Sequence, residues 1–290
     1  RNVDLFALFD KYGADATRWY LLYVSPVWVP TKFDEDGLIE VQGKFFGTLR
    51  NVYNFFTLYA NNDNIDAAAC FVDYAKRPEL DRWILSRWNS LIKTVTEAMD
   101  AYDHNKTVHA IQDFVAEDLS NWYIRRARRR FYAEGLDDDK KSVYATTYEI
   151  LAGLAKLMAP FAPFITEEIY GNLTGESVHL ALYPKADEAL IDGQLEERMD
   201  IVRSAVTMGR GIREKTRIKV RQPFSQLLLD GKFEEKIGYM TDLIKEELNV
   251  KQVVFEQNMD EYLNYTLKPD FRAAGPVLGK NIQAFGATIA

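Results

Sequence analysis

The chain has 290 residues, enough for about two domains at roughly 100 to 200 residues each. Its hydrophobic content of 47% and charged content of 27% are those of a folded globular protein and exclude a disordered or collagen-like chain. The single cysteine, Cys70, excludes an internal disulfide and a multi-cysteine zinc site. Because the net charge is −7, binding to nucleic acid would depend on where the basic residues gather.

The most apolar stretch, residues 150–165, gives no sign of a membrane span. It is interrupted by Lys156, Pro160 and Pro163 and is shorter than the roughly 20 residues that a spanning helix needs. The chain starts at Arg1, in the middle of a helical pattern and without a secretory leader. We therefore expect a cytoplasmic protein with no membrane partner, and a fragment of something longer.

Apolar residues recur at spacings of three and four from residue 3 to about residue 170, which predicts a helix bundle over residues 1–185. Asp34 or Asp36 is suited to cap the third helix, and Pro163 is suited to the first turn of the last one. The expected helices cover residues 4–11, 14–24, 36–60, 79–102, 105–133, 140–158 and 163–173.

The pattern changes after residue 170 and predicts a second, small α+β domain over residues 190–290. Residues 178–183 are expected to form a short strand before a polar linker. Within the domain we expect helices at 194–215 and 233–247 and strands at SQLLLDG, KQVVFEQ and YLNYTLKP. The fold class is thus mainly α, a helix bundle followed by a small α+β domain.

Residues 122–131 form a first basic island with no acidic residue. The arginines are Arg125, Arg126, Arg128, Arg129 and Arg130. At about 100° per residue, Ile124, Ala127 and Phe131 form an apolar stripe opposite them, and Trp122 lies on the basic side. Arginines beside an aromatic ring suit a single-stranded RNA loop. The arc is too wide for one RNA surface, so we expect two of the arginines to be structural. Alternatively, the arginines pair with nearby acids and Trp122 packs against a neighbouring helix.

A second basic island covers residues 210–221, where Glu214 is the single acid. Its cations are Arg210, Arg213, Lys215, Arg217, Lys219 and Arg221. RNA binding is one interpretation. The other is a helix end whose cations complement the macrodipole.

No catalytic or metal-binding motif is present in the sequence. It contains no GxGxxG, GxxxxGK[ST] or GxSxG pattern, and His104, His109 and His179 lack the spacing of metal ligands. We therefore expect no catalytic residue and no metal site in this chain.

Several runs of the sequence resemble one family. DLSNWYIRRARRRF, LDRWILSRWNSL and KLMAPFAPFITEEIY resemble the anticodon-binding helix bundle of class I aminoacyl-tRNA synthetases of the isoleucine, valine, leucine and methionine group. FALFDKYGADATRWYLL resembles the segment just after that family's KMSKS loop. IREKTRIKVRQPFSQLLL, ELNVKQVVF and NYTLKPDFRAAGPVLGKNI are similar to the C-terminal region of isoleucyl-tRNA synthetases, in the branch that includes eukaryotic-like enzymes.

The resemblance implies a parent enzyme that joins isoleucine to its tRNA with ATP and Mg. The HIGH and KMSKS signatures and the inserted editing domain are absent from this sequence. We therefore expect this chain to be a catalytically inactive, monomeric fragment that needs no cofactor. We expect it to bind tRNA(Ile) and not DNA. The alternatives are the same module of a valyl- or leucyl-tRNA synthetase, and a helical scaffold for protein partners.

The resemblance also implies which residues contact tRNA. Those expected to face the anticodon stem and loop are Asn121, Trp122, Arg125, Arg128 and Arg129. Arg125 and Arg129 are the expected phosphate contacts and Trp122 the stacking candidate. The C-terminal domain is expected to add Arg213, Arg217, Lys219 and Arg221, and its last loop Lys268, Arg272 and Lys280. RNA affinity is expected to fall more with Arg125→Ala or Arg129→Ala than with Lys140→Ala.

Overall fold

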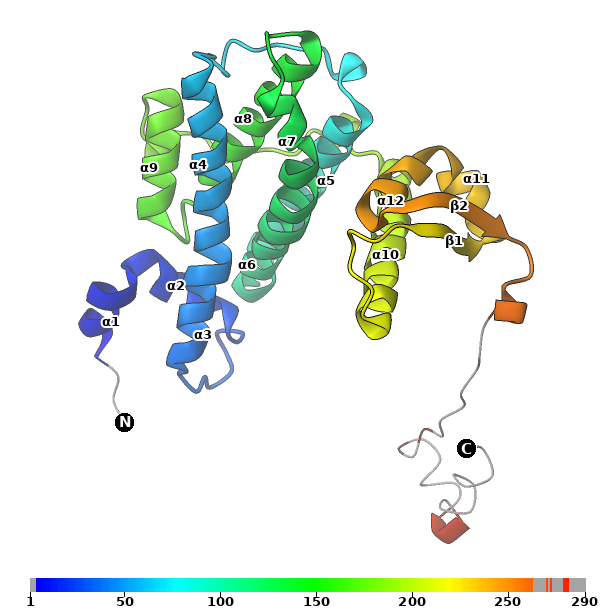
Figure 1. The fold of residues 1–290 in the computed structure, drawn as a ribbon. Helices are drawn as coiled ribbons and strands as arrows, with labels where there is room; N and C mark the ends of the chain where they lie inside the picture. Colours follow the sequence, from blue (N-terminus) through cyan, green and yellow to red (C-terminus); the bar gives the residue numbers. More distant parts are fainter. Residues whose placement is uncertain (1–3, 263–269, 271, 273–278, 282–290) are drawn as a thin grey trace. The chain divides into compact units, whose positions relative to one another are not determined.

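The chain folds into two compact units, which a computed structural model describes over residues 4–262, 270, 272 and 279–281 (Figure 1). The first unit spans Arg1–Glu196 and the second Glu197–Ala290. Helix α10 (Gly193–Thr216) begins in the first unit and continues into the second.

The first unit opens with short helices that lead into one long helical rod. The elements are α1 (Leu5–Tyr12), α2 (Ala14–Tyr23), α3 (Glu35–Glu40), a π-helix (Val41–Phe46) and α4 (Gly47–Asn62). The Asp4 carboxylate caps α1 and the Asp34 carboxylate caps α3, so one of the two predicted caps for the third helix is confirmed. In the core beneath, Trp19 of α2 stacks on Phe45 with ring centroids 4.4 Å apart.

The rest of the bundle consists of two long antiparallel pairs and the helix that carries the first basic island. The elements are α5 (Glu79–Asp100), α6 (His104–Asp113), a π-helix (Phe114–Ile124), α7 (Arg125–Tyr132), α8 (Asp138–Met158) and α9 (Pro163–Thr174). Helix α5 packs against α6 and α8 against α9, while α7 contacts α8. The seven predicted helices of the bundle are confirmed. The spacing of apolar residues did not predict that two of them contain a π-helical stretch.

The strand predicted at residues 178–183 is wrong. Val178–Leu180 is a single 3-10 turn, and the Glu167 carboxylate of α9 accepts hydrogen bonds from the Val178 backbone N–H and the Ser177 hydroxyl. Because the Glu167 side chain of α9 already accepts a hydrogen bond from the Val178 N–H, this backbone group does not need a partner in a neighbouring strand.

The second unit is a β-α-β arrangement packed on the helix that precedes it. Its elements after α10 are β1 (Phe224–Asp230), α11 (Glu234–Ile237), α12 (Thr241–Leu248) and β2 (Val250–Glu256). The strands pair in parallel, from Phe224 opposite Val250 to Asp230 opposite Glu256. A parallel pair needs a crossover connection, and α11 and α12 supply it.

The predicted α+β character of this unit is confirmed, with two differences in detail. The single helix expected over residues 233–247 is two short helices, separated by a 3-10 turn at Gly238–Met240. Of the strand expected at YLNYTLKP, only Tyr262 is described, and it ends a 3-10 turn, Met259–Tyr262. The other residues of that predicted strand lie outside the described part of the chain.

Candidate nucleic-acid interface

Helix α7 presents one exposed, cationic side and one buried, apolar side. Ala127 and Phe131 are fully buried, as the predicted apolar stripe requires. The opposite side carries Arg125, Arg128, Arg129 and Tyr132, spaced at i, i+3, i+4 and i+7 along the helix; we call these four residues the α7 face. Arg128 and Arg129 are exposed and Arg125 is half-buried. The α7 face therefore offers two to three cations to a ligand.

Arg130 points away from this face and is structural. Its guanidinium pairs with Asp81 of α5 and with Asp139 of α8. Asp81 is fully buried, and it also accepts hydrogen bonds from the hydroxyls of Tyr123 and Ser142. Burial raises the pKa of Tyr123 well above its ordinary value, so this phenol stays a hydrogen-bond donor. The network fixes α7 against α5 and α8, and it confirms that part of the first island is structural.

The side chain of Arg125 is hydrogen-bonded to the backbone of Asn121, one turn earlier in the helix. The Arg125 Nε donates to the Asn121 carbonyl oxygen at 2.7 Å. Asn121 is exposed, and its amide donates to the Glu117 carboxylate at 3.3 Å. Arg129 makes no ion pair with any residue in the described part of the chain. Arg129 is thus the cation of the α7 face with the fewest competing interactions.

Trp122 lies on the basic side of the helix as expected, but its ring is buried, which contradicts its expected role as the stacking residue. Its side chain is only 5% exposed, and the guanidiniums of Arg125 and Arg126 lie 5.9 and 5.5 Å from the centre of its ring. The helical wheel therefore gives the right neighbours for Trp122, but it cannot show that Arg125 and Arg126 lie against the ring and leave little of it accessible to a base.

Aromatic side chains that the sequence did not point to lie on the α7 face and next to it. Tyr132 is 51% exposed, and its ring centroid is 4.9 Å from that of Tyr59 of α4. Phe55, one turn earlier on α4, lies 5.0 Å from Tyr59, and the Arg128 guanidinium is 5.8 Å from the Phe55 ring. Tyr59 and Tyr132 are far apart in sequence, and no spacing pattern connects them.

In the second unit, Arg213 is not available to RNA. It is 3% exposed, and its two terminal nitrogens donate to the carbonyl oxygens of Lys219, Gln222, Leu248 and Asn249. Its guanidinium also lies 4.0 Å from the Phe224 ring. The prediction that Arg213 contacts tRNA is therefore corrected: this arginine joins the loop after α10 to the end of α12.

The remaining predicted cations of this island are exposed. Arg217, Lys219 and Arg221, which we call the loop cations, lie in the turn after α10. Arg217 adopts a left-handed backbone conformation with φ of 57°. A shallow pocket of about 330 Å³ lies here, lined by both Arg217 and Lys219. Arg210, by contrast, is paired with the buried Glu247 carboxylate at 2.5 Å.

The third predicted set is barely represented. Lys268 and the side chain of Lys280 lie outside the described residues. Arg272 is exposed, and its backbone N–H donates to the Asp270 carboxylate at 2.9 Å.

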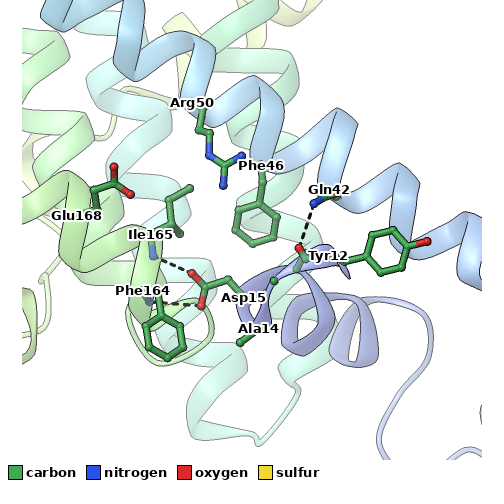
Figure 2. Close-up of a pocket in the computed structure, with 11 residues that line it drawn as sticks. Tyr12, Ala14, Asp15, Gln42, Phe46, Arg50, Phe164, Ile165 and Glu168 are labelled. Carbon is green, nitrogen blue, oxygen red and sulfur yellow. Dashed lines mark hydrogen bonds between the residues drawn. The ribbon is translucent and has the colours of Figure 1, made fainter. Parts of the chain in front are cut away.

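A pocket of about 250 Å³ lies between α2, α4 and α9 (Figure 2). Figure 2 shows the Asp15 carboxylate reaching the backbone N–H groups of Phe164 and Ile165, at 3.3 and 2.7 Å. Asp15 thereby caps α9, whose own N-cap residue, Ala162, has no capping side chain. Burial raises the pKa of Asp15 above 3.8, against these hydrogen bonds. The pocket is thus built around a helix cap.

The described residues contain no cluster of three or more His, Cys, Asp or Glu side chains arranged to hold a metal ion. Among the same residues, no helix combines the length and the apolar character of a membrane span.

Comparisons with known proteins agree on one family. The family model "Anticodon-binding domain of tRNA ligase" matches residues 81–229, more than half of the chain, and this range includes both basic islands. Isoleucine--tRNA ligases of Cytophaga hutchinsonii and Porphyromonas gingivalis are each 43% identical over 99% of this chain, and that of Clostridium novyi is 42% identical over 99%. The chain spans only 27%, 26% and 28% of these proteins.

One solved structure agrees with the fold. It is the LeuRS of Agrobacterium radiobacter K84 agnB2 in its ternary complex with tRNA and LeuAMS, with a TM-score of 0.50 and 23% identity over 66% of this chain and 22% of that one. The helical bundle, the basic side of α7 and the match of the family model together place this chain in the family of anticodon-binding domains of tRNA ligases.

Proposed function

We propose that this chain binds the anticodon stem and loop of isoleucine tRNA, as part of a longer ligase that attaches isoleucine to tRNA(Ile) with ATP. The observation that carries the proposal is the α7 face, where Arg128 and Arg129 are exposed within the segment that the family model matches. The identity of 43% to isoleucine--tRNA ligases supports isoleucine as the amino acid.

The charge of the α7 face supports contacts to phosphate. The sequence of α7, RRARRRFY, contains no acid, and Arg129 lacks an ion-pair partner in the described part of the chain. Guanidinium groups bind phosphate oxygens through paired hydrogen bonds. In the second unit the exposed loop cations supply a second set of phosphate contacts. The two sets give the chain a local attraction for RNA despite its net charge of −7.

Phosphate contacts position an RNA, whereas contacts to unstacked bases select it. Binding energy collected at the anticodon can orient the far end of the tRNA toward the reacting groups and appear as rate. In this proposal the chain supplies binding and selection, and the bond-forming chemistry belongs to other parts of the ligase.

The experiment is a binding measurement with the whole chain. Its affinity is measured for isoleucine tRNA, for an anticodon variant of that tRNA and for valine and leucine tRNAs, each at two salt concentrations. We expect the cognate tRNA to bind about 5- to 140-fold more tightly than the anticodon variant, the range of 1 to 3 kcal/mol for one good base contact. Preference for valine or leucine tRNA would assign the chain to a valyl- or leucyl-tRNA synthetase. Absence of any complex at low salt would favour the alternative function, a helical scaffold for protein partners.

Variants of single arginines identify the RNA-binding side. Arg129→Ala is expected to weaken binding and to reduce the dependence of log K on log salt by about 0.7 to 0.9. The matched control is Arg50→Ala, which removes an exposed arginine of α4 at the pocket of Figure 2. Equal effects of the two variants would contradict the assignment of the α7 face.

A further inference from the structure

Three aromatic side chains lie at the surface between the last turns of α4 and the end of α7. We call Phe55, Tyr59 and Tyr132 the aromatic platform. We propose that this platform stacks unpaired bases of the anticodon loop while Arg128 and Arg129 hold the neighbouring phosphates; this inference rests on the function proposed above. It names the base-binding surface of the chain, in place of the buried Trp122.

The three rings contact one another, with successive ring planes tilted by 51° and 46°. Tyr59 lies between the other two, with centroid distances of 5.0 Å to Phe55 and 4.9 Å to Tyr132. Tyr132 is 51% exposed, and Phe55 and Tyr59 are half-buried. A half-exposed ring can accept a base on its free side while its other side rests on protein, which is how aromatic residues bind single-stranded nucleic acid.

The platform is fixed from below by the core. Phe55 packs edge-on against the buried Phe131 at 5.1 Å, and Phe131 packs edge-on against the buried Tyr144 at 5.0 Å. Because these rings are held by close packing, the platform needs little ordering when a base arrives.

Lys140 fixes the two helices that carry the platform. Its ammonium group, on a side chain only 4% exposed, lies 2.6 Å from the Asp63 carboxylate and donates to the Ala133 carbonyl oxygen at 2.6 Å. Asp63 is the C-cap residue of α4, and Ala133 follows directly after Tyr132. The two bonds tie the end of α4 to the end of α7 and so set the distance between Tyr59 and Tyr132.

The positive charge beside the aromatic platform favours RNA as its ligand. On α7, Arg128 and Arg129 precede Tyr132 by four and three residues and therefore lie on the same face. The Arg128 guanidinium also lies over the Phe55 ring, 5.8 Å from its centroid, so one cation is held at the Phe55 end of the platform, next to Tyr59 and Tyr132. Rings beside arginines match a ligand that has flat bases joined by phosphates.

The test uses the full chain and an RNA hairpin with the anticodon stem and loop of isoleucine tRNA, carrying 2-aminopurine at one loop position at a time. Tyr132→Leu removes the ring, and Tyr132→Phe keeps it. Phe164→Leu is the matched control, because Phe164 is 67% exposed at the start of α9, beside the pocket of Figure 2.

We expect Tyr132→Leu to weaken binding about 5- to 140-fold, the range measured for the loss of one stacked base. The salt dependence should stay that of the unmodified chain, because no phosphate contact is lost. At one loop position, 2-aminopurine should be quenched in the complex with the unmodified chain and in that with Tyr132→Phe, but not with Tyr132→Leu. Phe164→Leu should behave as the unmodified chain.

The outcomes separate this inference from the proposed function. If the unmodified chain binds the hairpin and Tyr132→Leu binds it equally well with the quenching retained, the platform does not stack bases, although the function stands. If the unmodified chain does not bind, the proposed function itself fails. Circular dichroism melting of Tyr132→Leu shows whether a weaker complex reflects a lost fold. If it does, Tyr59→Leu, which removes the neighbouring ring of the platform, takes its place in the same measurements.

Discussion

The guanidinium of Arg130 grips the carboxylate of Asp81 through two parallel hydrogen bonds, Nη1 to Oδ1 at 2.5 Å and Nη2 to Oδ2 at 2.8 Å. Two further bonds reach the same carboxylate from the hydroxyls of Tyr123 and Ser142. A buried carboxylate with four hydrogen bonds to it is well compensated for the loss of water. The Arg130–Asp81 pair fixes the rotation of α7 about its own axis. As a result, Arg128 and Arg129 face outward.

Asp81→Ala is expected to lower the free energy of unfolding by about 3 to 5 kcal/mol, because it leaves the partly buried Arg130 without its main counter-charge. Urea denaturation followed by circular dichroism measures this loss. Arg129→Ala, which removes an exposed arginine one position away, should stay within about 0.5 kcal/mol of the unmodified chain. Similar losses for both variants would contradict the division of this helix into a structural and an RNA-binding side.

Phe131→Ala is expected to cost about 3 to 5 kcal/mol of stability, since this ring is fully buried and its removal leaves a cavity. The same denaturation experiment measures it. The ring also supports Phe55, so the variant should disturb RNA binding indirectly as well. A loss below about 1 kcal/mol would show that the site collapses around the missing ring.

Sequence periodicity was sufficient for the bundle, since helices with one apolar stripe repeat at three and four residues. The predicted stripe is buried: Ala127 and Phe131 lie in α7, and Ile124 is the last residue of the π-helix before it. The burial of Trp122 could not be predicted in this way, because it depends on how the Arg125 and Arg126 side chains lie against its ring.

Tertiary contacts decided the other differences. Arg213 has the same local pattern as the loop cations, yet it alone is buried, because carbonyl groups distant in sequence accept from it. Lys140 stands in an acidic turn and was expected to be a neutral control, but it is 3% exposed and tied to Asp63. Tyr59 and Tyr132 come together only in the folded bundle. In each case the partner lies too far along the chain for spacing to predict it.

Asp63 is expected to titrate below its ordinary pKa of 3.8, because the Lys140 ammonium donates a hydrogen bond to its carboxylate form. A lowered pKa in the folded state means that this contribution to stability is complete above about 3.8 and is lost as the pH falls through the folded value. Carboxyl NMR titration of Asp63 measures the midpoint. In Lys140→Met the midpoint should rise toward 3.8, and an unchanged midpoint would mean that Lys140 is not the cause.

In the second unit, as in α7, we expect different cationic residues to contribute to stability and to RNA binding. Arg213→Leu would leave carbonyl oxygens of four residues without their shared donor, and an unsatisfied buried acceptor costs about 1 to 3 kcal/mol. We therefore expect a loss of about 3 kcal/mol or more in the stability of this unit, measured by denaturation of the whole chain.

The triple variant Arg217→Ala, Lys219→Ala and Arg221→Ala should have the opposite profile. These side chains are exposed, so stability should change little, while each lost phosphate contact should lower the salt dependence of tRNA binding by about 0.7 to 0.9. Titrations of tRNA at several salt concentrations measure the slope. If the slope is unchanged, the loop cations do not touch RNA, and the α7 face alone accounts for the attraction to phosphate.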